Sequence, residues 1–262
     1  MKYFKKQSDI VTDQGKTVTI YKLEVDEDEK ILDEWAKHLR EHYCSDDDLD
    51  FLVPSTGLTN QQFLSQIKFP DPVKTPGPSV MSGDFAEILV HDYIEFIQHC
   101  YTTRTRYENK INRNSSPMGS DVLGYKCQSV NSPSTKDELH ILEVKAQASE
   151  SKSVAKLQNA IKDSGKDIVR LAESLNAEVQ RLRNKSKIEE ARIVQRYQNS
   201  TDKPYKRIFF AVAVHSKSSY SEHLVKKVDV SNHPDQNVNL LIIYSEQLLS
   251  VIKEMYVRAS QC

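Results

Sequence analysis

The stretch ELHILEVKAQ, residues 138–147, decides the fold, because two charged side chains stand inside an apolar run. An apolar segment of this length predicts a strand that is buried on at least one face. Side chains two residues apart on a strand point to the same face, so Glu143 and Lys145 share one. Burial of unpaired ions costs on the order of several kcal/mol for each ion. The pair is therefore either a satisfied salt bridge or part of an active site.

The segments around this strand predict a mixed α+β sheet that helices cover on both faces. Strands are expected at 17–25, 101–108, 121–128, 138–146, 207–214 and 238–244. Helices are expected at 29–43 and 60–68, from Val80 with Ser82 or Asp84 as cap, at 151–186 as one helix or two, and at 246–257. From Val80 on, the order is helix, three strands, helix and strand. Segments 121–128 and 138–146 are expected to pair as a hairpin.

The proline-rich segment PDPVKTPGP, residues 70–78, predicts a linker between two parts of the chain. The first part, residues 1–70, is an acidic α+β region with an acidic loop at 45–50, and it is expected either to dock a partner or to inhibit the rest of the chain. The second, residues 79–262, is the expected catalytic domain with a C-terminal strand and helix.

Composition narrows the class of protein. The chain has 262 residues, of which 38% are hydrophobic and 28% charged, as is typical of a globular protein. No apolar run approaches the roughly 20 residues of a membrane span. The N-terminal stretch MKYFKKQSDI lacks the apolar core of a secretory signal, and the four cysteines are scattered. A cytoplasmic protein with reduced thiols is expected.

Three acidic residues and one lysine form the candidate active site. Asp121 opens the strand that pairs with 138–146, so the hairpin brings it near Glu143 and Lys145. Glu87, on the preceding helix, offers a third carboxylate. Carboxylates are ligands that suit Mg²⁺, with Mn²⁺ as a substitute. Such a metal lowers the pKa of a bound water, and Lys145 would orient that water or stabilise the transition state.

These features resemble the PD-(D/E)xK nuclease superfamily and its restriction-endonuclease-like fold. The resemblance rests on Glu87, Asp121 and the triplet Glu143-Val144-Lys145, and it covers residues 80 to about 215. The triplet alone is weak evidence, because 28–30, 108–110 and 150–152 match it in polar surroundings. The resemblance implies metal-dependent hydrolysis of a phosphodiester, with Glu87, Asp121 and Glu143 as metal ligands.

The runs MSGDFAEILVHDYI, RTRYENKINRNSSPMGSDVLGY and LEVKAQ also resemble the HamA family, the nuclease subunits of the Hachiman anti-phage defence system. That resemblance implies a DNA nuclease that a superfamily 2 DNA helicase partner holds in check. Two alternatives stay open: a DNA repair or recombination nuclease of the same fold, and a non-catalytic module for nucleic-acid binding and assembly.

Further polar residues extend the expected site. Arg104 and Arg106 would share one face of the strand 101–108 and, with Lys110, contact phosphates. An exposed edge strand protected by charge is the alternative. Gln147 follows Lys145 by two and would lie on the same face, either to orient the lysine or the phosphate or simply as the polar end of the strand. His38 and His42 have a spacing that can bind zinc, but no fourth ligand is apparent and an exposed position on an acidic helix is favoured.

Overall fold

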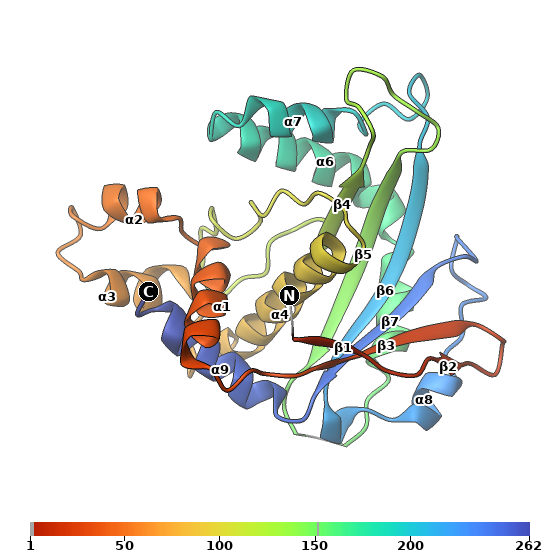
Figure 1. Ribbon diagram of the computed structural model, residues 1–262, viewed down its shortest axis with the longest axis horizontal. Helices are drawn as coiled ribbons and strands as arrows, with labels where there is room; N and C mark the ends of the chain where they lie inside the picture. The colour runs from red at the N-terminus through yellow and green to blue at the C-terminus, as the bar shows by residue number, and fades with distance from the viewer. Residues whose placement is uncertain (1–2, 151) are drawn as a thin grey trace.

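The computed structural model describes residues 3–150 and 152–262, and its strands form one mixed sheet (Figure 1). The strands are β1 (Phe4–Lys6), β2 (Ile10–Val11), β3 (Thr17–Leu23), β4 (Val122–Lys126), β5 (Glu138–Gln147), β6 (Lys206–Ser216) and β7 (Asn239–Ser245). Their order is β1-β3-β7-β6-β5-β4, and β2 pairs with β3. Neighbours from β3 to β5 run parallel, whereas β4 is antiparallel to β5 and β1 to β3.

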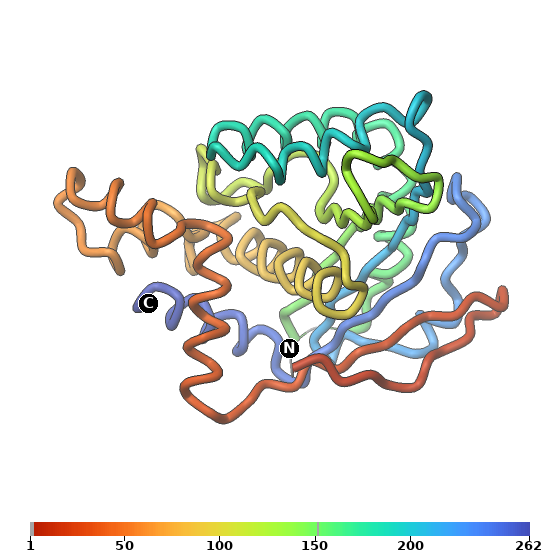
Figure 2. The backbone as a smooth tube through the Cα atoms, turned by 45° about the horizontal axis from the view of Figure 1, so that its top comes forward, coloured from red at the N-terminus to blue at the C-terminus, as the bar shows by residue number. Residues whose placement is uncertain are grey.

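Helices cover both faces of the sheet (Figure 2). The helices are α1 (Glu29–Glu41), α2 (Asp46–Leu52), α3 (Asn60–Phe63), α4 (Gly77–Asp92), α5 (Lys156–Ser164), α6 (Asp167–Asn184), α7 (Ile188–Gln195), α8 (Glu222–Lys226) and α9 (Leu248–Ala259), with short turns η1 (Leu64–Lys68), η2 (Tyr93–Ile97) and η3 (Lys217–Ser219). Leu142 and Val144 of β5 pack in the core with α1, α4 and α9, and Ile141 packs in the core with α5, α6 and α7. The predicted mixed sheet with two covered faces is confirmed.

The predicted hairpin and the division of the long helical segment agree with the structure. β4 and β5 pair antiparallel, with Val122 opposite Leu142 and Lys126 opposite Glu138. Within the predicted helical segment 151–186, the structure has two helices, α5 and α6, which are separated at Gly165, and residue 151 lies outside the described residues. The helix α7 had no counterpart among the predicted elements.

The predicted strand at 101–108 is wrong. Only Tyr101 makes a bridge, to Tyr125, and the chain then continues through irregular structure and turns. Arg104 and Arg106 therefore do not share a strand face. Each is instead paired with acidic side chains of the segment that α4 and η2 form. The pairing of these arginines with buried acids decides the course of the segment, and no local pattern in the sequence reveals that pairing.

Two predicted helix boundaries are also wrong. The expected acidic loop at 45–50 lies in α2, where the Ser45 side chain accepts a hydrogen bond from the Asp48 amide and the Asp48 carboxylate accepts one from the Ser45 amide. Carboxylates are favourable in the first turn of a helix, so the acidic run favours helix there. The helix α4 begins at Gly77 instead of at Ser82 or Asp84, because proline fits the first helical turn.

Residues of the N-terminal region take part in the central sheet. Val18 to Lys22 of β3 pair in parallel with Leu240 to Tyr244 of β7. The helix α1 packs against α9, and both lie on the same side of the sheet as α4 (Figure 1). The segments on either side of residues 70–78 thus share one sheet and one core.

Candidate active site

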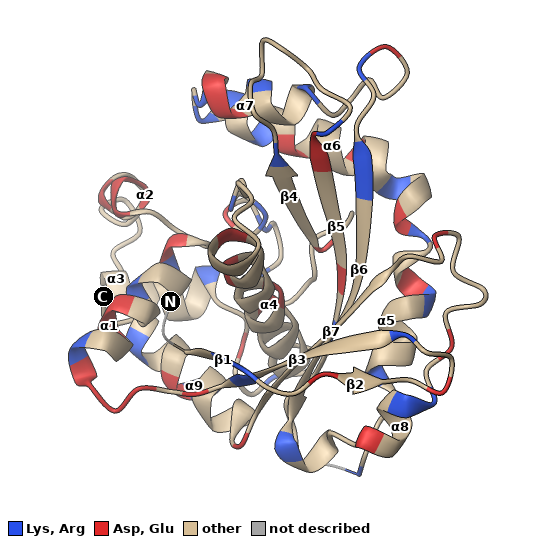
Figure 3. Cartoon of the chain, turned by 45° about the vertical axis from the view of Figure 1, so that its right-hand side comes forward, with Lys and Arg blue, Asp and Glu red and all other residues tan. Residues whose placement is uncertain are grey.

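The β4–β5 hairpin brings the predicted site residues together. Val122 pairs with Leu142, so Asp121, one residue earlier, lies opposite Glu143. The Asp121 Oδ2 accepts a 2.9 Å hydrogen bond from the amide of Val144, which ties this carboxylate to β5. Charged residues thus interrupt a strand whose neighbours in the central sheet are mostly uncharged (Figure 3). The expected meeting of Asp121 with Glu143 is present in the structure.

Glu143 and Lys145 form an ion pair on the face of β5 that α5 and α6 cover. The Lys145 Nζ donates to Glu143 Oε1 at 2.6 Å and lies 3.0 Å from Asp163 Oδ2. The other oxygen of Glu143 accepts from Arg170 at 3.3 Å. Burial and then the charge of Asp121 raise the pKa of Glu143. Burial disfavours the charged form of Lys145, but the hydrogen bonds and charges of Glu143, Asp163 and Asp121 together outweigh it and raise the Lys145 pKa.

Arg106 joins two of the predicted acids. Its Nε donates to Glu87 Oε2 at 2.9 Å, and its Nη2 donates to Asp121 Oδ1 at 3.1 Å. Its Nη1 donates to the carbonyl oxygen of Ser120 at 2.5 Å, and the residue is only 9% exposed. Arg106 is therefore a buried link between α4 and the start of β4, and no phosphate contact is proposed for it.

The pKa values of the acids reflect the cost of gathering negative charge in a buried place. Burial, and after it the charge of Glu87, raises the pKa of Asp121 to about 7. Burial also raises the pKa of Glu87, although Arg106 opposes the shift. Perturbed carboxylates of this kind mark functional sites more often than ordinary surface acids do. A nearby cation that neutralises the carboxylates would offset the repulsion.

Two of the three predicted acids fit Mg²⁺. Asp121 and Glu143 lie on neighbouring strands and offer hard oxygen ligands, which suit the ion and which now accept from Arg106, Lys145 and Arg170. Glu87 instead directs Oε2 to Arg106 and to the hydroxyl of Tyr107, which donates at 2.6 Å. The three acids do not form a set of ligand atoms within 4.8 Å of one another in the part of the chain that the structure describes. Asp121 and Glu143 fit the ion, and Glu87 lies behind Arg106.

Other expected DNA contacts also lie in internal pairs. Arg104 contacts Asp92 and Glu95, and the Lys110 Nζ donates to Asp84 Oδ2 at 2.6 Å. With the Arg106–Glu87 pair, these contacts align segment 104–110 antiparallel to α4 and η2. Gln147 is half-buried on β5, on the same face as Lys145, and its amide donates to the Ser149 hydroxyl at 2.7 Å.

Sequence reasoning missed three polar residues beside the hairpin: Asp163, Asp167 and Arg170. Asp163 pairs with Lys145, and Arg170 lies between Glu143 and Asp167, with 2.9 Å to the latter. Burial and then the charge of Glu143 raise the pKa of Asp167 to about 6. A signal was available for two of them, because positions 167 and 170 lie at helical spacing on α6, whereas Asp163 belongs to the separate helix α5.

Comparison with known proteins agrees with this architecture at the level of family. The model of the HamA family matches residues 1–259 of the chain. No curated protein matches the sequence. None of the helices in residues 3–150 and 152–262 is long and apolar enough to cross a membrane. Since the family model spans nearly the whole chain, the protein belongs to the HamA family, a family of the Hachiman antiviral defence system.

Proposed function

We propose that the chain is a metal-dependent DNA nuclease, the effector of a Hachiman anti-phage complex in which a superfamily 2 DNA helicase restrains it. The observation that carries this proposal is the meeting of Asp121 with Glu143 and Lys145 at the β4–β5 hairpin. A salt bridge in the core needs one acid and one base. Here a second acid whose pKa is raised to about 7 lies beside the pair, which a structural bridge does not require.

Asp121 and Glu143 would hold one Mg²⁺ ion, or Mn²⁺ in its place. When bound, the ion lowers the pKa of a water and offsets negative charge on the phosphate. Lys145 donates to the attacking water or to a phosphate oxygen, and its contacts with Glu143 and Asp163 fix its ammonium group. Arg106 holds Asp121 in place from the side of α4. Hydrolysis adds water across one phosphodiester bond and leaves a phosphate end and a hydroxyl end.

Arg170 is the residue best placed to meet the DNA backbone. Its side chain is 37% exposed, and one of its nitrogens lies 3.3 Å from Glu143. A phosphate that approaches the hairpin therefore meets a guanidinium that is both accessible and next to the acids. Arg104, Arg106 and Lys110 lack that exposure, with side chains 22%, 8% and 4% exposed. We therefore assign phosphate contact to Arg170, with Gln147 beside it on β5.

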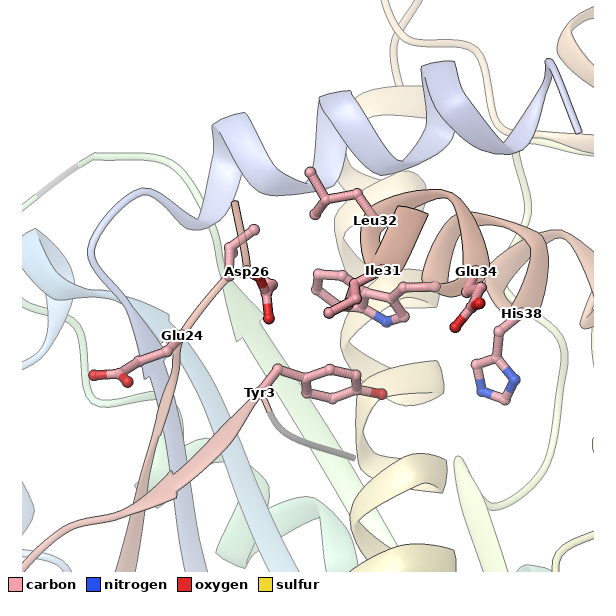
Figure 4. Close-up of a pocket in the computed structure, with 9 residues that line it drawn as sticks. Tyr3, Glu24, Asp26, Ile31, Leu32, Glu34 and His38 are labelled. Atoms are coloured by element: carbon pink, nitrogen blue, oxygen red, sulfur yellow. The ribbon is translucent and has the colours of Figure 1, made fainter. Parts of the chain in front are cut away.

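A pocket in the N-terminal region is the proposed docking place for the helicase. Its cavity volume is 610 Å³, and its apolar lining comprises Tyr3, Val25, Ile31, Leu32 and Trp35. Figure 4 shows Glu24, Asp26 and Glu34 around the same pocket. An apolar cavity with an acidic border suits a segment that inserts an apolar side chain between lysines or arginines.

The proposed function is tested by purifying the chain together with its helicase. The complex is incubated with plasmid DNA, once with Mg²⁺ and once with EDTA. Degradation only with Mg²⁺, and its loss in Glu143→Gln with the complex intact, is the expected result. Equal degradation by the wild type and Glu143→Gln would contradict the assignment.

A further inference from the structure

On the face of the sheet that α1 and α4 cover, two histidines and a buried carboxylate lie close together. His38 and His42 lie one turn apart on α1, and Asp92 ends α4. One ligand atom from each lies within 4.8 Å of the other two. His42 is 1% exposed and Asp92 is fully buried, so the expected exposed position is wrong for His42, whereas the His38 side chain is 23% exposed. The nuclease mechanism uses none of these three residues.

The hydrogen-bond chemistry of this cluster requires a cation. The His38 Nε2 lies 2.7 Å from Asp92 Oδ1 and 2.8 Å from Arg104 Nη1. A single ring nitrogen cannot donate to the carboxylate and accept from the guanidinium at the same time. If it accepts from Arg104, it is unprotonated and lies 2.7 Å from the Asp92 oxygen, which is also an acceptor. Hydrogen-bond acceptors of His38, His42 and Asp92 thus point to the centre of the cluster, where a positive charge stabilises them.

The Arg104 guanidinium supplies that positive charge in this structure, and it also contacts Glu95. Its Nη1 also lies 2.6 Å from the Nε2 of His42, so this one nitrogen serves both imidazoles. Its Nε and Nη2 contact Glu95 at the edge of the cluster, and its side chain is 22% exposed. Its Nη2 also donates to Asp92 Oδ1 at 3.1 Å, so another cation would have to displace the guanidinium from Asp92 and both imidazoles, with Glu95 as its remaining acidic partner.

A third histidine, next to the cluster, has no hydrogen-bond partner within the described residues. His91 is 2% exposed, and neither of its ring nitrogens makes a hydrogen bond there. Its ring centre lies 5.7 Å from that of His42, whose Nδ1 is likewise without a partner in residues 3–150 and 152–262. A buried imidazole without a hydrogen bond is costly. A ligand at the cluster would give this imidazole a role.

We propose that His38, His42 and Asp92 form a binding site for Zn²⁺ that Arg104 occupies in the absence of metal. Two imidazole nitrogens and one carboxylate oxygen are a common zinc donor set, and water or His91 completes the four ligands. The site joins α1 to the end of the helix that carries Glu87. It goes beyond the proposed nuclease function and does not depend on it.

The test uses the full chain after treatment with EDTA, in an Asp121→Asn, Glu143→Gln background that removes the acids of the hairpin. Zn²⁺ affinity is measured by competition with a chromophoric chelator, and Co²⁺ serves as a spectroscopic probe of four-coordinate geometry. One equivalent of Zn²⁺ should bind, and His42→Gln and His38→Gln should each lose it. The matched control is His215→Gln, a buried histidine outside the cluster, which should bind normally.

Arg104→Gln gives a result that does not depend on the histidine variants folding. Removal of the competing guanidinium should tighten Zn²⁺ binding by about tenfold or more. Circular dichroism checks the fold of each variant. No Zn²⁺ binding by the background chain, or the same affinity in Arg104→Gln and in the background, would overturn the proposal. Binding that persists in both His38→Gln and His42→Gln, each folded, would also overturn it.

Discussion

Glu143 and Lys145 form one ion pair, yet the two side chains differ sharply in their access to solvent. The Glu143 side chain is 5% exposed and that of Lys145 is 30% exposed. The carboxylate is thus fixed inside the sheet layer, while the ammonium group reaches the side from which water and DNA must come. This difference suits a site that holds a metal at the base and presents a proton donor at the rim.

Because of Asp121, the stability of the folded chain should fall as pH rises. Bound metal should offset this loss. Its folded pKa is raised to about 7, and its unfolded value is about 3.9, so the folded chain holds the proton more tightly. The contribution of Asp121 is present below pH 4 and is lost as pH rises through 7. Melting temperatures in EDTA between pH 4 and 8 should show this loss. Asp121→Asn should flatten it, and Mg²⁺ at pH 8 should stabilise only the wild type.

A result in which Asp121→Asn melts well below the wild type at pH 8 in EDTA would contradict this electrostatic account. It would mean that the charged carboxylate stabilises the metal-free fold. Asparagine keeps an oxygen for the Val144 amide but turns its NH2 group toward Arg106, so the comparison removes the charge together with the hydrogen bond that Asp121 Oδ1 accepts from Arg106.

Arg106 should contribute to stability because it compensates buried acids. Arg106→Gln leaves Glu87 without its guanidinium partner, and the free energy of unfolding should fall by about 3 kcal/mol in urea titrations. The exposed Arg207 provides the control, since Arg207→Gln should change stability by less than about 0.5 kcal/mol. Equal changes in the free energy of unfolding for Arg106→Gln and Arg207→Gln would show that the contacts of Arg106 with Glu87 and Asp121 do not stabilise the fold.

Arg170 should contribute to DNA binding through one phosphate. Arg170→Gln should weaken the affinity for DNA and lower the slope of log affinity against log salt by about 1. Arg192, on α7, is 58% exposed and pairs with Glu189, so Arg192→Gln should leave the slope unchanged. Fluorescence anisotropy at several salt concentrations measures both. An unchanged slope in Arg170→Gln would remove this residue from the proposed interface.

The acidic pocket predicts which substitutions separate the nuclease from its helicase. Asp26→Lys with Glu34→Lys reverses the charge at the pocket and should abolish co-purification, because both would repel a basic segment. The matched control reverses Asp47 and Asp50, which are exposed on α2 away from the pocket lining. If the control disrupts the complex and the pocket variant does not, docking occurs on α2 instead.

The sequence predicted the parts of the site that follow from strand geometry. Period-two alternation placed Glu143 and Lys145 on one face, and hairpin pairing brought Asp121 to them. It could not predict the course of Arg104 and Arg106, because their acidic partners lie on a helix and no local pattern specifies that pairing. Likewise, His42 is buried only because α4 and segment 104–110 pack against α1. Such contacts depend on tertiary packing and leave no periodic signal in the sequence.

The measurement that tests the central claim most directly is DNA cleavage by Lys145→Met in the purified helicase complex with Mg²⁺. Lys126, an exposed lysine on the adjacent strand β4, gives the matched control Lys126→Met. The account predicts that Lys145→Met lowers the cleavage rate by about 100-fold or more while the complex and its fold remain intact. Lys126→Met should cleave like the wild type. Equal rates for Lys145→Met and Lys126→Met would show that the ion pair with Glu143 is structural and that the nuclease site lies elsewhere.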